Sequence, residues 1–231
     1  LCSGEGGMFV TDKEEIYKAA RQVWSFGETR SPAESRDYHA YALGWMYRNN
    51  DLTAAFARAQ LTKLDRYIET QRQNAAVLIE TLRGTPALIL PTEPAGHFHN
   101  WYNYTSRIDF SKVGWTGDKS LFRDAVMTAI QAEGVPVGTW QRFILPAMTV
   151  FQAKNAYGKG CPWHCQGAAD VDYSPSRFPV AQLHTDTHFG MTVPLRAPQG
   201  PDAARYTGEA IRKVFERIGE IDPDRILKPK S

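Results

Sequence analysis

The sequence predicts an α/β protein of two parts, and three observations lead to this prediction. Apolar residues recur at three- and four-residue steps from Asp51 to Arg83, the pattern of one long amphipathic helix. Gly84 and Pro86 end this helix, and the pattern after them changes to a mixture of strands and helices. At ~1.5 Å per residue the helix would be roughly 45–50 Å long, so we expect it to link two parts of a molecule. We therefore expect one domain over residues 1–84 and a small α+β domain over residues 85–231.

The first part should contain a strand and a helix before the long helix. Met8–Thr11 follows a glycine-rich turn and reads as a short buried strand. A helix is expected from about Lys13 to Trp24, with Asp12 as its N-cap and acidic residues in its first turn. Residues 27–43 show no period and are expected to form a long irregular loop.

The second part should alternate between strands and helices, separated by a long irregular segment. Aromatic and β-branched residues favour a strand, and apolar residues on one face favour a helix. The expected elements are a strand at His99–Phe110, a helix at Lys119–Glu133, an extended piece at Val135–Val137, few regular elements from Gly138 to Thr187, a strand at Met191–Leu195 and a helix from Pro201 to about Ile218.

Composition excludes several classes of protein. The chain has 231 residues, 42% of them hydrophobic and 23% charged, as in ordinary soluble globular proteins. Its 27 basic and 25 acidic residues give a net charge of +2 without a long basic run, so we expect no nucleic-acid partner. No apolar stretch approaches the ~18 residues of a membrane span. Three cysteines argue against a secreted disulfide scaffold and favour the cytoplasm.

Cysteines and histidines do not form a recognisable metal site. Cys161 and Cys165 flank Pro162-Trp163-His164, but a zinc site needs about four ligands and no second pair follows. A structural loop is the favoured interpretation, and a disulfide between the two cysteines is unexpected in a reducing compartment. No histidine pair has the spacing of a known metal motif, although His184 and His188 could share a helix face. We expect no bound metal.

Two motifs in order resemble the DegT-type (DegT/DnrJ/StrS) sugar aminotransferases, which are fold-type I enzymes. Residues 4–11 read Gly-Glu-Gly-Gly-Met-Phe-Val-Thr, similar to the family's G-E-G-G segment, and residues 44–48 read Gly-Trp-Met-Tyr-Arg, similar to its G-x-N-x-R block. His99-Asn100-Trp101-Tyr102 resembles the strand that opens the family's small domain, and Gly134-Val135 resembles its helix-to-strand step. The resemblance covers the chain in outline and is strongest over residues 4–84. It implies the end of the large domain, the linking helix and the small C-terminal domain of such an enzyme.

The resemblance implies an activity and a cofactor. Family members use pyridoxal 5′-phosphate (PLP) to move an amino group from glutamate or glutamine to a keto group on a nucleotide-linked sugar or aminocyclitol precursor. A lysine forms a Schiff base with the cofactor and then moves protons. Homodimers with shared active sites are implied as well.

The family's catalytic lysine lies a few residues before G-E-G-G, so it would precede Leu1. We therefore expect this chain alone to be inactive, with no catalytic residue of its own. Truncation of an ordinary enzyme is favoured over a split enzyme whose partner supplies the lysine. Two alternatives stay open: a PLP-dependent sugar dehydratase, which has histidine in place of the lysine, and a non-catalytic subunit that pairs with a complete homologue.

The G-x-N-x-R block supplies the expected cofactor-binding residues Met46, Tyr47 and Arg48. The family's asparagine reaches the cofactor phosphate across the dimer, but Met46 occupies its position and cannot donate a hydrogen bond. Arg48 matches the family's arginine and could bring its charge to the phosphate or the substrate. Tyr47 and Asn49 are candidate substitutes for the missing amide. Arg48 could instead pair with a nearby carboxylate.

The expected substrate-binding residues lie in the second part. Trp140, Gln141 and Arg142 follow the Gly134–Gly138 segment, where family members place residues at the active-site mouth. An aromatic ring beside polar groups suits a ring with hydroxyls, and an arginine suits a phosphate or carboxylate. His99 belongs to the resemblance described above, and Tyr157 opens an aromatic loop that could cover the mouth. An ordinary packed surface loop explains the Tyr157 segment equally well.

Overall fold

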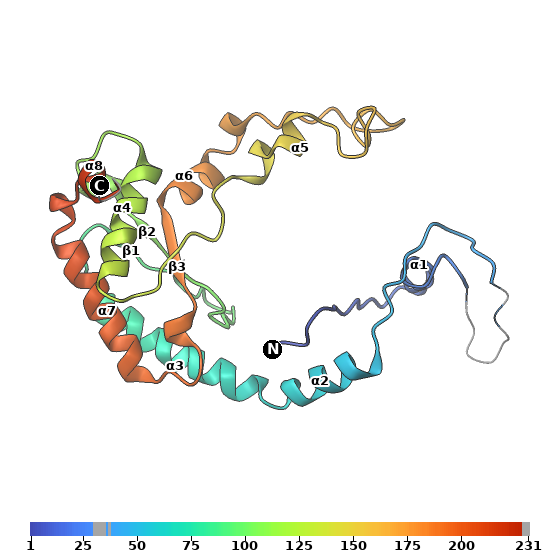
Figure 1. Cartoon of the computed structure of the whole chain (residues 1–231), viewed down its shortest axis with the longest axis horizontal. Coiled ribbons are helices and arrows are strands. Elements are labelled where there is room, and N and C mark those ends of the chain that lie inside the picture. Colours follow the sequence, from blue (N-terminus) through green and yellow to red (C-terminus); the bar gives the residue numbers. More distant parts are fainter. Residues whose placement is uncertain (30–35, 37, 228–231) are drawn as a thin grey trace. The chain divides into compact units, whose positions relative to one another are not determined.

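The computed structural model describes residues 1–29, 36 and 38–227, and its backbone contacts form two compact units, Leu1–Arg66 and Tyr67–Ser231 (Figure 1). The junction between the units falls within a long helical stretch of the chain. The domain division near Gly84 remains a prediction. Across the described ranges, no helix combines the length and apolar character needed to cross a membrane.

Among the described residues of the first unit are the helices α1 (Glu14–Trp24) and α2 (Asp51–Leu61). The helix predicted at Lys13–Trp24 is confirmed, but its predicted cap is wrong. Lys13 takes the N-cap position without a side-chain hydrogen bond, so Asp12 lies one residue too early to cap the first turn. Asn50 caps α2, because its side chain accepts a hydrogen bond from the Thr53 amide at 3.0 Å.

The predicted strand at Met8–Thr11 is wrong. This segment has no regular secondary structure, and the side chains of Met8, Phe9 and Val10 are 90%, 64% and 81% exposed. A strand needs a neighbouring strand to satisfy its backbone groups, and none of the described residues provides one here. The apolar residues of this segment are suited to a buried strand. They form one only where a neighbouring strand covers them, and the sequence pattern does not reveal whether such a strand exists.

The single helix predicted over Asp51–Arg83 is also wrong. It is divided into α2 and α3 (Leu64–Leu82) by a turn at Thr62 and Lys63. At this turn the Thr62 hydroxyl donates to the Ala59 carbonyl at 2.9 Å, and the Lys63 amide donates to the Gln60 carbonyl at 3.0 Å. Because these tighter bonds replace the regular helical ones, the helix is interrupted while the apolar period continues past the turn.

The second unit is built on a three-stranded antiparallel sheet in the order β1 (Leu88–Ile89), β2 (Tyr104–Ile108), β3 (His188–Met191). The register pairs Leu88 with Ile108 in the first ladder, and Tyr104 with Met191 in the second. Gly138 forms an isolated bridge with Gly190, which brings the predicted extended segment beside β3.

Both predicted strands need correction. The strand at His99–Phe110 is confined to its second half, because residues before Tyr104 form a loop. The strand predicted at Met191–Leu195 is misplaced: β3 ends at Met191, and Val193–Leu195 forms a short 3₁₀ helix, η4. Pro194 explains this difference, since proline lacks the amide that a ladder requires.

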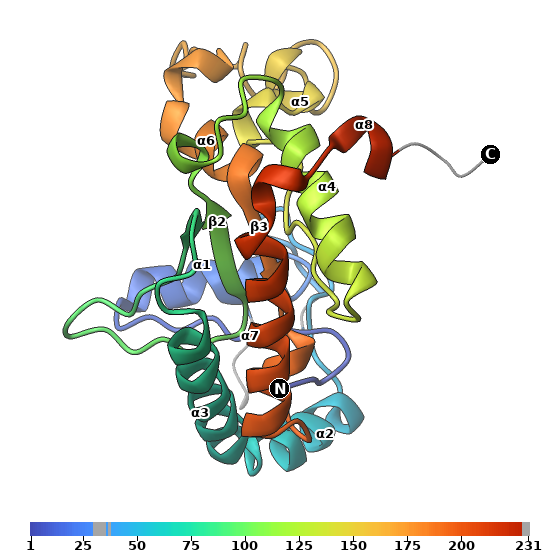
Figure 2. The same ribbon diagram turned by 90° about the vertical axis from the view of Figure 1, so that its left-hand side faces the viewer.

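Helices α4 (Lys119–Ala132) and α7 (Pro201–Glu216) confirm two predictions, and they lie against the sheet together with α3 (Figure 2). The Asp118 side chain caps α4 by accepting from the amides of Ser120 and Leu121. The expectation of few regular elements from Gly138 to Thr187 missed α6 (Pro179–Thr187), which leads directly into β3. The unit also contains the one-turn helices α5 (Thr149–Gln152) and α8 (Pro223–Ile226) and several short 3₁₀ helices.

One hydrophobic core holds the second unit together. Tyr104 at its centre is fully buried, its hydroxyl has no hydrogen-bond partner among the described residues, and burial raises its pKa. The fully buried Asn74 of α3 donates to the carbonyls of Leu195 and Gln199, which fixes the turn after β3. Other large members of this core are Leu78, Leu82, Trp101, Phe122, Ile130, Phe189, Leu195, Ile211 and Phe215.

Candidate functional site

The sheet presents two different faces, and the candidate site lies on the polar one. Along β2, Tyr104, Ser106 and Ile108 are buried, whereas the alternate residues Thr105 and Arg107 are half-buried on the opposite face. The register places Gly190 opposite Thr105. A shallow pocket of about 210 Å³ opens here, between β2, β3 and the extended segment that ends at Trp140. Its lining residues are Asn103, Thr105, Pro136, Gly138, Thr139, Trp140, His188, Gly190, Met191 and Thr192.

Gly190 allows the strands to approach closely at the pocket. A side chain at this position would start 3.1 Å from the Tyr104 carbonyl oxygen and 3.3 Å from Thr105 Oγ1. The Gly190 and Gly138 backbones exchange hydrogen bonds of 3.0 and 2.8 Å, which anchors the segment that carries Trp140. A side chain at this position would crowd the Tyr104 carbonyl and Thr105, so glycine suits the close approach at this part of the pocket.

His188 connects α6, β3 and the segment that carries Trp140. It is only 2% exposed, and its Nδ1 lies 2.8 Å from the His184 carbonyl oxygen. Its Nε2 accepts a hydrogen bond from the Trp140 amide at 3.3 Å. These two contacts assign the proton to Nδ1 and leave Nε2 as the acceptor. Because both ring nitrogens are occupied, His188 is suited to positioning Trp140 and not to moving a proton.

The ring of His184 stacks on that of His188, with centroids 4.7 Å apart and planes 5° apart. Partial burial lowers the pKa of His184, and electrostatic interactions with the adjacent His188 ring and with the positively charged Arg107 lower it further. The stacked pair therefore favours the neutral form of His184.

An aromatic wall flanks the pocket. Trp140 is 66% exposed, and its ring meets that of Tyr102 edge-to-face with centroids 6.1 Å apart. The guanidinium of Arg196 lies over the Tyr102 ring at 5.0 Å. An aromatic face beside threonine hydroxyls and the Asn103 amide can bind a ring that carries hydroxyl groups.

Of the predicted substrate-binding residues, only Trp140 lines this pocket. Gln141 and Arg142 follow it on an exposed stretch and do not contribute to the lining. Tyr157 is 85% exposed in a separate loop and lines neither of the pockets described here. Their proposed contacts with a substrate remain predictions.

His99 organises a loop outside the pocket. The Glu93 carboxylate accepts from the His99 amide at 2.7 Å, and Arg72 donates both to Glu93 at 2.6 Å and to the His99 carbonyl at 2.6 Å. His99 Nδ1 accepts from the Trp101 amide at 2.8 Å, and the two rings stack 4.2 Å apart. The Arg72 guanidinium, helped by the His99 amide, lowers the pKa of Glu93 to about 2. His99 thus contributes its backbone and one ring nitrogen to loop structure.

The G-x-N-x-R block lies in the first unit. Met46 bridges Ser25 in a short antiparallel pair, and the rings of Trp45 and Tyr47 stack 6.0 Å apart. Gly44 packs tightly, since a side chain there would start 2.1 Å from the Gly27 amide nitrogen. The side chains of Met46 and Tyr47 are exposed.

Arg48 is the residue of this block that has a buried polar atom without a hydrogen-bond partner among the described residues. Its guanidinium lies 5.3 Å from the centroid of the Phe26 ring, and its Nε is buried without a hydrogen-bond partner in the described part of the chain. A buried guanidinium nitrogen without an acceptor fits an anionic group such as a phosphate. The thioether of Met46 offers no donor to the same group. The block therefore fits PLP at Arg48 and not at Met46.

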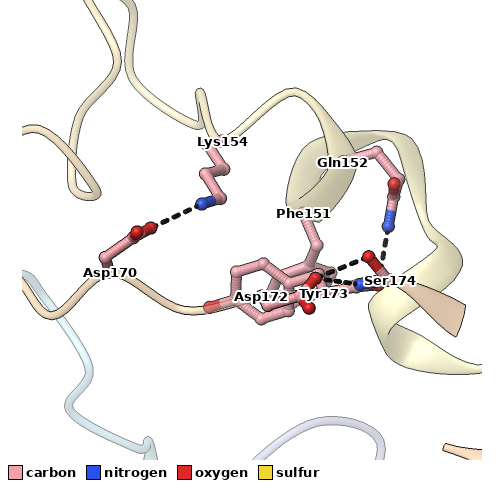
Figure 3. A pocket seen from close by; sticks show the side chains of 7 residues that line it. All are labelled: Phe151, Gln152, Lys154, Asp170, Asp172, Tyr173 and Ser174. Carbon is pink, nitrogen blue, oxygen red and sulfur yellow. Dashed lines mark hydrogen bonds and ion pairs between the residues drawn. The ribbon is translucent and has the colours of Figure 1, made fainter. Parts of the chain in front are cut away.

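A larger pocket of about 320 Å³ lies in the loops around α5 (Figure 3). Its polar groups bind one another: Lys154 pairs with Asp170 at 3.0 Å, and the Ser174 amide and hydroxyl donate to Asp172 at 2.8 and 2.6 Å. The hydrogen bonds from Ser174 lower the pKa of Asp172. Because these groups already have partners, this pocket is less suited than the sheet pocket to a polar ligand.

Sequence reasoning missed most of the sheet pocket. The residues missed are Asn103, Thr105, Thr139, His188 and Thr192. Alternation along the predicted strand is a signal that could have found Thr105. The others lie on three segments that only the tertiary structure brings together.

The second unit is a helix-covered antiparallel sheet with a polar pocket on its other face. The G-E-G-G and G-W-M-Y-R motifs lie in the non-helical segments that precede α1 and α2 in the first unit. Together, this α/β architecture and these motifs point to the aminotransferase class. The family model of the DegT/DnrJ/EryC1/StrS aminotransferase family matches residues 1–170. The chain belongs to this family. The enzymes of the family depend on PLP, and solved relatives include PLP and pyridoxamine phosphate forms.

Individual relatives agree with this assignment. Over 133 residues the chain is 31% identical to the UDP-N-acetyl-3-dehydro-alpha-D-glucosamine 3-aminotransferase of Acidithiobacillus ferrooxidans, an alignment that covers 58% of this chain and 31% of that protein. The fold is similar to that of 3-amino-5-hydroxybenzoic acid synthase, with a TM-score of 0.68 and 21% identity over 89% of this chain and 48% of the other. It is also similar to that of S. venezuelae DesV, with a TM-score of 0.67 and 18% identity over 90% and 46%.

The chain spans about half the length of these solved structures and about a third of the curated relative. The solved structures therefore support an α/β fold shared with aminotransferases over about half of each enzyme.

Proposed function

We propose that the enzyme to which this chain contributes is a PLP-dependent aminotransferase that moves an amino group from glutamate or glutamine to a keto group on a nucleotide-linked sugar or an aminocyclitol precursor. The observation that carries the proposal is the family match over residues 1–170. The curated relative is named for a UDP-linked 3-keto sugar, which supports a substrate of this class.

The sheet pocket is the proposed site for part of the sugar. Trp140 offers an exposed aromatic face on which a pyranose ring can stack, while Asn103, Thr105, Thr139 and Thr192 offer hydrogen bonds to its hydroxyls. Gly190 keeps the pocket open, and His188 holds the backbone of Trp140 in place. We assign Arg142 to a phosphate or carboxylate of the substrate, because its side chain follows Trp140 and is exposed.

The cofactor would be held in part by the first unit. When bound, PLP supplies an electron sink for the carbanion that forms as the amino group is transferred. Arg48 would bind the cofactor phosphate through the guanidinium whose Nε lacks a partner among the described residues. Tyr47 would add its exposed hydroxyl where Met46 cannot donate.

The lysine that bonds to PLP is not matched by any lysine of this sequence, and the resemblance places it before G-E-G-G. The proposal also includes a homodimer with shared active sites, located in the cytoplasm. Sedimentation of the full-length enzyme would measure the assembly, and a monomer at working concentration would contradict that part of the proposal.

The test uses the full-length enzyme loaded with PLP, glutamate as donor and a UDP-linked 3-keto sugar as acceptor. We expect keto-sugar-dependent formation of 2-oxoglutarate and a product that carries the new amino group. Trp140→Ala should raise KM for the sugar roughly 5–30-fold, since a stacking contact contributes about 1–2 kcal/mol. Tyr206→Ala is the matched control, because Tyr206 is an exposed aromatic residue of α7 outside the pocket. Absence of amino transfer to any keto sugar or cyclitol ketone would contradict the proposal.

A second candidate function, a non-catalytic partner of a complete homologue, is favoured only by Met46. If this candidate is correct, Met46→Asn will not increase the affinity of the full-length protein for PLP. The full-length protein will instead co-purify with a homologous subunit. If the aminotransferase proposal is correct, Met46→Asn will leave activity intact or raise it.

A further inference from the structure

Cys161 and Cys165 lie in a turn that brings their sulfur atoms to within 2.9 Å of each other. Both cysteines are free, with Cys165 exposed and Cys161 half-buried. Backbone hydrogen bonds hold this turn: the His164 amide donates to the Gly160 carbonyl at 2.9 Å, and the Cys165 amide donates to the Pro162 carbonyl at 3.3 Å. An S–S bond is about 2.05 Å long, so the sulfurs need to move only about 1 Å to form one.

The surroundings do not supply a metal site. Among the described residues, no group of three or more histidine, cysteine, aspartate or glutamate side chains is placed to hold a metal ion. The ring of His164, the nearest candidate in sequence, lies against Gly160, where a side chain would start 2.0 Å from its Nδ1. A dithiol without a third ligand is suited to sulfur–sulfur chemistry.

We propose that Cys161 and Cys165 form a redox-modification site that reacts with a low-molecular-weight disulfide and closes as a reversible intramolecular disulfide. In the first step the Cys165 thiolate attacks one sulfur of the oxidant, which forms a mixed disulfide and releases one thiol. In the second step the Cys161 thiolate attacks the Cys165 sulfur and releases the second thiol. Two protein thiols are oxidised and one external disulfide is reduced to two thiols, so electrons and protons balance.

Exposure and proximity determine the order of these steps. Cys165 is the more exposed thiol and therefore the more accessible to the oxidant. The Cys161 sulfur is already in contact with it, so the second step is intramolecular and outcompetes attack by a further external thiol. Contact with Cys161 raises the pKa of the Cys165 thiol, so the first step should accelerate as the pH rises above neutral.

The site is connected to the larger pocket. Trp163, between the two cysteines, donates from Nε1 to the Tyr173 hydroxyl at 3.0 Å, and its ring meets that of Phe151 with centroids 6.0 Å apart. Phe151 and Tyr173 both line the 320 Å³ pocket around α5. Closure of the disulfide would restrain the turn that carries Trp163, and therefore also this aromatic cluster.

The test is thiol mapping of the chain in glutathione buffers of stepwise oxidising strength. Trypsin cleavage after Lys159 and Arg177 places both cysteines in one peptide, and the exposed Cys2 is a built-in control in another peptide. After alkylation of free thiols, we expect the first peptide to lose two hydrogens and to carry no alkyl group, whereas Cys2 is alkylated or carries glutathione. Dithiothreitol should restore both thiols.

Cys161→Ser and Cys165→Ser separate proximity from general thiol reactivity. Each variant should accumulate glutathione on its remaining cysteine, because no neighbour is left to displace it. Circular dichroism checks that both variants keep the wild-type secondary structure. Thiol mapping of the wild-type protein in parallel tests the proposal without any substitution, so it does not depend on the folding of the variants. If Cys161 and Cys165 of the wild type carry glutathione or alkyl groups to the same extent as Cys2 at every oxidising strength, the proposal is wrong.

Discussion

Replacing His188 tests whether the imidazole holds the Trp140 segment against β3. His188→Ala removes two hydrogen bonds, one to the His184 carbonyl at 2.8 Å and one from the Trp140 amide at 3.3 Å. His188→Asn is the informative variant, because its shorter amide can still donate near the Nδ1 position but offers no acceptor at the Nε2 position. The two variants thus separate the contact to α6 from the contact to Trp140.

The expected magnitudes follow from the geometry. Each hydrogen bond contributes about 1 kcal/mol, and the Trp140 bond, at the long end of the usual range, contributes at most that. His188→Ala should therefore lower the free energy of unfolding of the second unit by about 2 kcal/mol, and His188→Asn by about 1 kcal/mol. Loss of about 1 kcal/mol at Trp140 corresponds to a roughly fivefold loss of amide protection.

Hydrogen exchange at the Trp140 amide and urea unfolding followed by near-ultraviolet circular dichroism measure the two effects. His184→Ala is the matched control, since that ring stacks on His188 and its removal leaves both hydrogen bonds in place. In both His188 variants we expect the Trp140 amide to exchange faster. Wild-type protection of this amide in His188→Asn would refute the assignment of Nε2 as its acceptor.

Two further predictions concern stability. Asn74→Ala should lower the free energy of unfolding by about 2–4 kcal/mol, because the carbonyls of Leu195 and Gln199 lose the buried donor that lies 3.0 and 2.9 Å from them. Chemical denaturation measures this change, and Gln73→Ala, at an exposed position of the same helix, should leave the free energy of unfolding nearly unchanged. Glu93 has a pKa lowered from 4.5 to about 2, so its stabilising contribution is present above pH 4.5 and is lost as the pH falls towards 2. Glu93→Gln should flatten the acid dependence of stability in that window, and an unchanged slope would contradict the Arg72–Glu93 pairing.

Helices were predictable where the apolar period agreed with local capping chemistry. The helix at Lys119–Ala132 has Asp118 to accept two amides at its start, and the helix from Pro201 begins with a residue preorganised for the first turn. The break at Thr62 was not predictable from the period, because it results from a hydroxyl that competes for a backbone carbonyl. Local chemistry therefore located the ends of helices better than their interruptions.

Strands were harder to predict, because a strand exists only with a partner. The apolar run at Met8–Thr11 has none among the described residues, whereas the short strand His188–Met191 exists because β2 lies beside it. The same dependence applies to the site. Trp140 was predicted from its chemistry and a resemblance, but Thr105 and His188 required knowledge of the sheet register.

The sequence by itself determined the family of this protein, through two motifs in the right order, together with the helices α1, α4 and α7 and the aromatic pocket residue Trp140. It also predicted Arg48 as a cofactor-binding residue and showed that Met46 stands where the family has an asparagine. Only the tertiary structure decided which polar residues share the pocket, that both nitrogens of His188 are occupied, and that Cys161 and Cys165 touch. The physical reason is the range of the interactions. Helix capping and the apolar period depend on residues within a few positions of one another. Sheet register and side-chain contacts join segments that are far apart in the sequence, or depend on the exact path of a turn.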